Sequence, residues 1–241
     1  MHAPQVAARE LPQVQPSFAM AGPTPKNIRR PRSPAASARN ALVLLLLTVV
    51  SAAWAQTTAL AQTEDQRFVA GLRDRQLYSL AASYCQRRLN DEKLSSQARA
   101  QLVVELSQTL VDDALNDSPA SSVGVWQQAI EETSHYVDRF PDPAWALVVR
   151  TQAGLVLLAR GELLRQQAEV AAQNETLLSE ARAHLRMAIR QLRAVEEELA
   201  ARLRDTRLPP AGAPTRDQLL ALQKNLRYEL ARAYLSQGQC Y

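Results

Sequence analysis

The segment from Glu175 to Arg207 constrains the fold of this chain more than any other, because its apolar residues follow the period of an α-helix. They recur every three or four positions, so they share one helix face. Such a seam is typical of helices that pack side by side as in a coiled coil. We therefore expect a long, coiled-coil-like helix pair. Its seam residues are Leu177, Ala181, Leu185, Ala188, Leu192, Val195, Leu199 and Leu203.

The composition extends this expectation to the rest of the chain. Leu, Ala, Gln, Arg and Glu dominate, and these side chains lose little rotamer freedom in a helix. Aromatic residues make up only 5%, and the runs of Val, Ile, Thr and Tyr between Gly turns that an all-β fold needs are absent. The sequence predicts an all-α protein.

The N-terminal region has the features of an export signal. Residues 1–40 are rich in Pro, Ala, Gln and Ser with clustered arginines, which predicts a disordered basic leader. The apolar run 41–55 is shorter than the roughly 20 residues that cross a bilayer, and it fits a signal-peptide hydrophobic region. Ala53-Trp54-Ala55 and Ala59-Leu60-Ala61 each offer an A-x-A cleavage site. We expect Sec-type export to the periplasm or cell envelope.

An uncleaved N-terminal anchor is the alternative. The hydrophobic segment would then remain in the membrane and hold residues 62–241 outside the cytoplasm. In that case this segment is the only membrane contact that we expect.

The net charge of +4 belongs to the leader. Six of the 28 Lys and Arg residues and one of the 24 Asp and Glu residues precede Gln56. This leaves 22 basic and 23 acidic residues in 56–241, a net charge of −1. A nucleic-acid-binding domain carries net positive charge, so we expect no nucleic-acid partner.

Residues 62–207 predict a helical domain. Glu64 to Asn90 predicts a first hairpin, in which the small residues Gly71 and Ala81 indicate a close helix crossing. The most hydrophobic segment, 144–172, is expected to be a central, buried helix. Ser95 or Ser96 and Asn174 are expected N-caps. The other predicted helices are Ser95–Asn116, Trp126–Pro141 and Glu175–Arg207.

The C-terminal region predicts a linker at 208–214 and an amphipathic helix at 215–241. Thr215 and Gln218 have the spacing of a capping box. A helical array needs a cap over its last apolar face, so we expect this helix to fold back on the body, to dimerise, or to belong to a longer protein. Its apolar side comprises Leu219, Leu222, Leu226, Leu230, Ala233 and Tyr234.

Aromatic and small residues recur at fixed offsets in three segments, and Pro closes one of them. The segments are Tyr78-x-x-Ala81-x-x-Tyr84, Trp126-x-x-Ala129 with Tyr136-x-x-x-Phe140-Pro141, and Ala181-x-x-x-Leu185-x-x-Ala188-Ile189. In this pattern the chain resembles tetratricopeptide-repeat (TPR) proteins over about 62–205, most closely the divergent repeats of extracytoplasmic bacterial proteins. The full W-x2-L-G-x2-Y signature is absent, and the helices after Pro143 are too long for a steady period of about 34 residues.

The resemblance implies antiparallel helical hairpins stacked as a solenoid, with a protein or peptide bound on a concave surface. It supplies no catalytic residues. Trp126 and Trp145 lie on apolar stripes, and we expect them to pack in the core rather than to anchor a ligand.

The sequence contains no P-loop, dinucleotide, zinc-protease, redox or hydrolase motif. Two Cys and three His lack the spacing of metal ligands. We therefore expect no enzyme, no cofactor and no metal. Export allows Cys85 and Cys240 to form a disulfide, but we favour two unpaired thiols.

Four arginines line one side of the long helix, and they are the candidate partner-binding residues. Like charges one turn apart slightly destabilise a helix, which suggests an acidic partner. A solvated face partly offset by Glu180 and Glu197 is the alternative. Glu197 is also expected to pair with the last arginine of the row, and Glu198 with Arg202. The four arginines are Arg182, Arg186, Arg190 and Arg193.

Three functions are compatible with this pattern. The first is an exported scaffold for protein–protein interaction. The second is a self-associating structural protein of the cell envelope, in which 175–205 forms the contact between copies. The third is the non-catalytic helical part of a larger envelope protein.

Overall fold

Seven α-helices make up the part of the chain that the computed structural model describes, which is 63–117, 119–140, 143–172, 174–205 and 212–241. No strand occurs in these ranges, which confirms the all-α class there. The leader, the 41–55 segment and both cleavage sites lie outside them. None of the described helices is long and apolar enough to span a bilayer.

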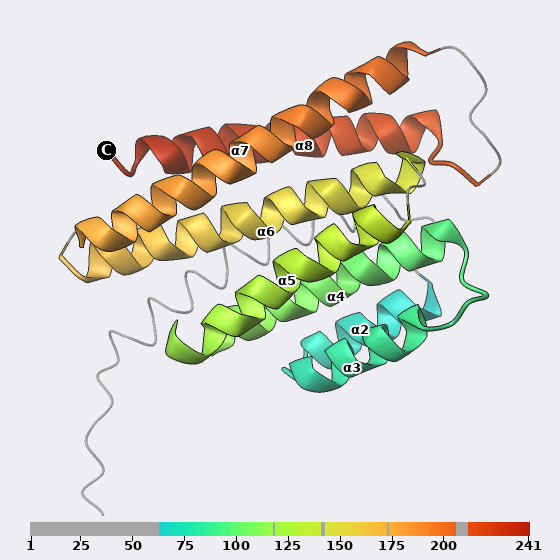
Figure 1. Ribbon diagram of the computed structural model, residues 1–241, viewed down its shortest axis with the longest axis horizontal. Coiled ribbons are helices and arrows are strands. Elements are labelled where there is room, and N and C mark those ends of the chain that lie inside the picture. The colour runs from blue at the N-terminus through green and yellow to red at the C-terminus, as the bar shows by residue number, and fades with distance from the viewer. Residues whose placement is uncertain (1–62, 118, 141–142, 173, 206–211) are drawn as a thin grey trace, which may run out of the picture. The chain divides into compact units, whose positions relative to one another are not determined.

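Six of the seven helices form three hairpins, and the last follows alone (Figure 1). Short connections join the two helices of each pair, so they run antiparallel. The hairpins are α2 (Glu64–Arg73) with α3 (Tyr78–Leu89), α4 (Ser96–Asn116) with α5 (Pro119–Arg139), and α6 (Pro143–Val170) with α7 (Glu175–Arg204); the last helix is α8 (Arg216–Gly238).

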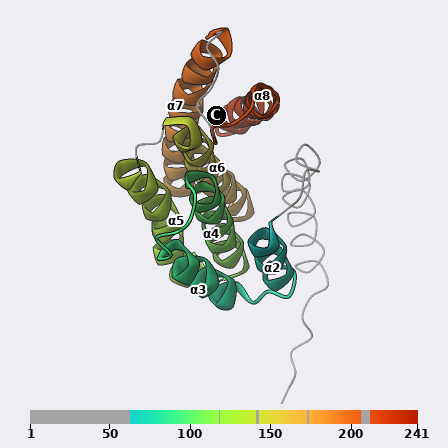
Figure 2. The same cartoon turned by 90° about the vertical axis from the view of Figure 1, so that its right-hand side faces the viewer.

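The helices pack in a regular order. Each helix contacts the next along the chain, and the even-numbered helices α2, α4, α6 and α8 also contact one another in sequence. In the described residues, α3, α5 and α7 do not pack against one another in this way, and α3 and α5 meet through Gln86, which donates to Glu132 Oε1 at 3.5 Å. Figure 2 shows α5 and α7 on the side opposite to α2 and α8. As a result, each hairpin touches only its neighbours.

Side-chain caps set several helix starts. Ser95 Oγ accepts a hydrogen bond from the Ala98 N–H at 3.2 Å, and Asn174 Oδ1 accepts one from the Thr176 N–H at 3.0 Å. Thr215 and Gln218 form the expected capping box. These side chains satisfy backbone donors that the first helical turn leaves without partners. The predicted caps are confirmed.

The predicted helix at Trp126–Pro141 starts earlier than expected. The helix α5 begins at Pro119, seven residues before the predicted start at Trp126. Proline fits the first helical position because the N–H that it lacks would have no acceptor within the helix there. Pro119 therefore separates α4 from α5 and also opens α5.

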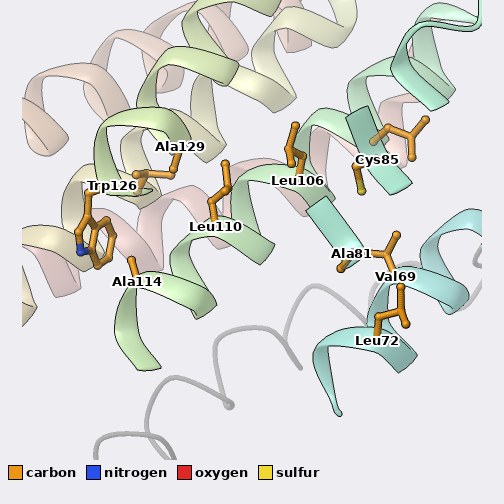
Figure 3. Close-up of a cluster of buried hydrophobic side chains, with 11 residues drawn as sticks. Val69, Leu72, Ala81, Cys85, Leu106, Leu110, Ala114, Trp126 and Ala129 are labelled. Atoms are coloured by element: carbon orange, nitrogen blue, oxygen red, sulfur yellow. The ribbon is translucent and has the colours of Figure 1, made fainter. Parts of the chain in front are cut away.

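The first apolar cluster joins the first two hairpins and includes Val156 of α6 (Figure 3). Trp126 belongs to this cluster, and its side chain is only 2% exposed. Trp145 is buried in a separate cluster, so the expected core role of both tryptophans is confirmed. The residues labelled in Figure 3 are Val69, Leu72, Ala81, Cys85, Leu106, Leu110, Ala114, Trp126 and Ala129.

The helix α6 is central, as expected, because it contacts α4, α5, α7 and α8. Its crossing with α7 is close at two glycines. A Cβ on Gly154 would lie 2.5 Å from Leu192 Cδ2, and one on Gly161 would lie 2.7 Å from Leu185 Cγ. The close crossing expected at Gly71 is wrong, because the nearest atom to its added Cβ is an Arg75 side-chain nitrogen at 3.4 Å.

The last helix folds back on the body, as one of the three expectations stated. Leu226 and Ala233 are completely buried among α6 and α7 residues. Tyr234 is a correction, since it is 40% exposed rather than part of the buried face. Before this helix, the Gly212 carbonyl accepts a hydrogen bond from Trp145 Nε1 at 2.8 Å. The described end of the predicted linker is thus fixed to the body.

Candidate partner-binding surface

The four predicted arginines lie on α7, on the side where α8 packs beside it. Arg182 forms an ion pair with Glu175 at 2.9 Å. Arg186, Arg190 and Arg193 are exposed, and none of them has an ion pair among the described residues. The row therefore presents three uncompensated guanidinium groups to solvent.

The last arginine of the row stacks on a tyrosine. The guanidinium of Arg193 lies 5.4 Å from the centre of the Tyr234 ring. Its expected pair with Glu197 does not form, whereas the second expected pair, Glu198 with Arg202, does form at 3.0 Å. Stacking on a partly exposed ring holds Arg193 against α8 and leaves its N–H groups without a carboxylate partner.

The first arginine of the row contacts the last residues of the chain. Arg182 Nε donates to the Cys240 carbonyl at 3.0 Å, and its guanidinium lies 5.1 Å from the Tyr241 ring. Tyr241 is 84% exposed. Figure 1 shows the C-terminus beside the first half of α7. The four arginines with Tyr234, Gln237 and Tyr241 are hereafter the α7/α8 edge.

A shallow depression lies in the middle of this edge. Its volume is about 290 Å³, and it is lined by Arg186, Ile189, Arg190 and Gln237. A second open depression lies on α8, lined by Asp217, Leu220, Ala221, Lys224 and Asn225. The first one combines two cations, an apolar wall and an amide. That lining suits one or two side chains of a peptide.

Two arginines outside the row tie one helix to another. Arg73 of α2 donates to Gln108 at 2.9 Å and forms an ion pair with Glu105 at 2.9 Å, both on α4. Arg232 of α8 binds both carboxylate oxygens of Glu162 on α6, at 2.6 and 2.8 Å. These arginines tie one helix to another, and their distant partners left no local signal in the sequence.

Burial and hydrogen bonds shift the pKa of several carboxyl groups at these helix contacts. Burial raises the pKa of Glu105, and the nearby Arg73 lowers it without fully offsetting that effect. Burial raises the pKa of Glu229 in the same way, against the opposing charge of Arg232. By contrast, the pKa of Asp65 is lowered, because hydrogen bonds from Tyr84 and Arg88 outweigh the raising effect of burial.

Both cysteines are buried free thiols, as favoured from the sequence. They belong to two different apolar clusters. Burial raises the pKa of Cys85 to about 12, and burial also raises the pKa of Cys240. A thiol attacks as its thiolate, so neither group is a ready nucleophile near neutral pH.

In the described ranges, no group of three or more His, Cys, Asp or Glu side chains could hold a metal ion. Comparisons of the chain with protein-family models, curated proteins and solved structures gave no match. Function must therefore be argued from the packing and the surface of the chain itself.

Proposed function

We propose that this protein is an exported, non-catalytic scaffold of TPR-like helical repeats that binds another protein or a peptide. The observation that carries the proposal is the packing order of the helices, in which each hairpin contacts only its neighbours. Helical arrays of this kind present a long continuous surface, and protein recognition is a common use of it. The proposed solenoid has three hairpins, with α8 covering the last one.

The proposed location rests on the sequence alone. The 41–55 hydrophobic segment and the two A-x-A sites support Sec-type export, and an anchor that stays in the membrane is the alternative. In either case, residues 62–241 face the periplasm or the outside of the cell.

Self-association through 175–205 is the weaker alternative. The seam residues Leu185, Leu192 and Leu199 are fully buried against α6 and α8 of the same chain. A coiled coil between two copies through this seam would have to displace those helices. The apolar surface for such a contact is already used within the chain.

A homo-oligomer through the outer face of α8 is a second candidate. Leu220, Tyr228 and Leu235 are exposed on this helix, and Tyr228 is 60% exposed. Solution mass measured over a range of protein concentrations tests it. A dimer that the change Tyr228→Glu converts to monomer would support this assembly, and a monomer at every concentration would exclude it.

Site-specific photo-crosslinking in the producing cell tests the scaffold function. A photoreactive phenylalanine analogue replaces Arg190 on the α7/α8 edge or, as the control, the exposed Arg87 on α3. After irradiation, we expect position 190 to give discrete adducts whose protein partner mass spectrometry identifies. Position 87 should not give the same adducts. Adducts at neither position, nor at further positions along the even-numbered helices, would contradict the proposal.

A further inference from the structure

We infer that the α7/α8 edge docks an acidic, extended segment of the partner protein. This inference rests on the proposed function and adds the chemistry of the partner. It assigns the arginine row to recognition of carboxylates, and the depression between the arginines to one apolar side chain of the same segment.

The first argument is uncompensated charge. Arg186, Arg190 and Arg193 are exposed and have no carboxylate partner among the described residues. Arg186 and Arg190 are one helical turn apart, where like charges weaken a helix. The two arginines therefore slightly destabilise α7. A carboxylate-bearing partner would remove that repulsion and use the unpaired N–H groups.

The second argument is spacing. An α-helix rises about 1.5 Å per residue, so Arg182, Arg186 and Arg190 follow one another at about 6 Å along the axis. Alternate residues of an extended peptide point to the same side and lie about 6.7 Å apart. Acidic residues at every second position of such a peptide would thus meet successive arginines. The guanidinium fork binds a carboxylate with two parallel hydrogen bonds.

The third argument is preorganisation at the two ends of the row. Arg193 stacks on Tyr234, and Arg182 is held by the Cys240 carbonyl and by the Tyr241 ring. Fixing these long side chains before binding lowers the entropy lost when the complex forms. The two end arginines are therefore already oriented along the edge.

The centre of the edge adds contacts that a peptide can use. Ile189 forms an apolar wall between Arg186 and Arg190, and Gln237 lines the same depression from α8. A Gln side chain offers both a donor and an acceptor, the pair that a peptide backbone needs. This combination favours a peptide with one apolar side chain among its acidic residues.

The boundaries of the row argue against a long polyanion. Glu175 lies at one end, paired with Arg182, and Glu196 lies at the other, paired with Arg227 at 3.1 Å. The unpaired arginines from Arg186 to Arg193 span only about 10 Å from the helix rise, and residues 56–241 together carry a net charge of −1. Nucleic acids and anionic membranes bind best to larger basic surfaces. A short acidic peptide matches this span.

Fluorescence anisotropy of the purified full chain tests the inference. The probe is a dye-labelled peptide in which Glu alternates with Ser around one Leu, and the control peptide carries Gln in place of Glu. We expect the Glu peptide to bind, the Gln peptide not to bind, and the affinity to fall as salt is raised. The double variant Arg186→Glu and Arg190→Glu should lower the affinity at least about tenfold.

The matched control is Arg67→Glu with Arg87→Glu, which makes the same charge change on exposed arginines of α2 and α3. It should leave the affinity unchanged, and circular dichroism should show both double variants folded. An equal loss in both variants would overturn the inference, because the effect would then be one of overall charge. Absence of Glu-peptide binding to the wild-type chain would overturn it as well.

Two further probes exclude other anions. Single-stranded oligothymidine and phosphatidylglycerol vesicles should bind less tightly than the peptide. Tighter binding of either, lost in the Arg186→Glu and Arg190→Glu variant, would replace the acidic peptide with a nucleic acid or a membrane. If the peptide fails while the position 190 crosslink still captures a protein, only this inference falls. If that crosslink also captures nothing, the proposed function falls with it.

Discussion

The arginines at the two ends of the helical array have different surroundings. At the α2/α3 end, Arg73 contacts Glu105 and Gln108 of α4, and Arg88 pairs with Asp65 at 3.2 Å. On α7, Arg186 and Arg190 extend into solvent without an acidic partner in the described part of the chain. Arg73 and Arg88 thus join helices, whereas Arg186 and Arg190 remain available for a partner.

The packing of the two ends differs in a related way. Helices α2 and α3 have 10 and 12 residues, whereas α6 and α7 have 28 and 30. The long pair has a continuous apolar seam and two glycines at its crossing. Its polar ties, Arg150 with Glu198 at 2.7 Å and Gln191 with the Arg150 carbonyl at 3.1 Å, do not involve the arginine row. The short pair buries less apolar surface and adds cross-helix ion pairs. We therefore expect Arg186 and Arg190 to be dispensable for folding.

Removal of Arg73 is expected to have the largest effect on stability. The change Arg73→Ala would remove the ion-pair partner of the buried Glu105 and the donor to the half-buried Gln108. Loss of one member of a buried pair is costly, and we expect the free energy of unfolding to fall by about 2–4 kcal/mol. Urea denaturation measures it. The matched change Arg190→Ala should shift the free energy of unfolding by less than about 0.5 kcal/mol. Equal losses in both variants would contradict the proposed difference between Arg73 and the arginine row.

Replacing glycines gives the next largest effect on stability. The change should destabilise the α6/α7 crossing at Gly161 and stabilise α2 at Gly71. Gly161→Ala would place a Cβ 2.7 Å from Leu185 Cγ and 3.2 Å from its backbone nitrogen, so we expect a loss of about 1–2 kcal/mol. Gly71→Ala meets only a flexible arginine tip at 3.4 Å. The better helix propensity of alanine should therefore stabilise α2 by about 0.5–1 kcal/mol. Thermal melts of both variants test this, and destabilisation by Gly71→Ala would contradict it.

The pH dependence of stability gives a smaller effect at the α2/α4 contact. Because burial raises the pKa of Glu105 in the folded state, this group binds its proton more tightly when folded. Its contribution to stability is full below its ordinary pKa of 4.5 and is lost as pH rises through the raised value. Wild type should therefore lose stability relative to Glu105→Gln between about pH 4 and pH 7. A relative gain over that range would mean that Arg73 outweighs burial.

Local sequence patterns were enough to predict the all-α class and several helix positions. The all-α class, the central α6 and the caps at Ser95, Asn174 and Thr215 all follow from local patterns, and the structure confirms them. The start of α5 was missed because Pro119 can end one helix and open the next. Gly154 and Gly161 were missed as well, although their spacing of seven places them on one helix face.

The candidate surface was only partly predictable. The arginine row is visible in the sequence because its members are three or four residues apart. The stacking of Arg193 on Tyr234 and the Cys240 contact of Arg182 depend on where α8 packs. A local pattern does not contain that information, because the partners lie 41 and 58 positions away along the chain. The same reasoning explains why Arg73 and Arg232 gave no sequence signal.

The most direct test of the central claim is the free energy of unfolding of the Arg186→Glu and Arg190→Glu variant, measured at low salt. If the row serves a partner and not the fold, reversing two of its charges should leave stability unchanged. New attractions to Arg182 and Arg193 offset the repulsion between the two acidic side chains, so any change should be a gain of no more than about 0.5 kcal/mol. A loss of about 2 kcal/mol or more, like that expected for Arg73→Ala, would contradict the account and make the row part of the fold.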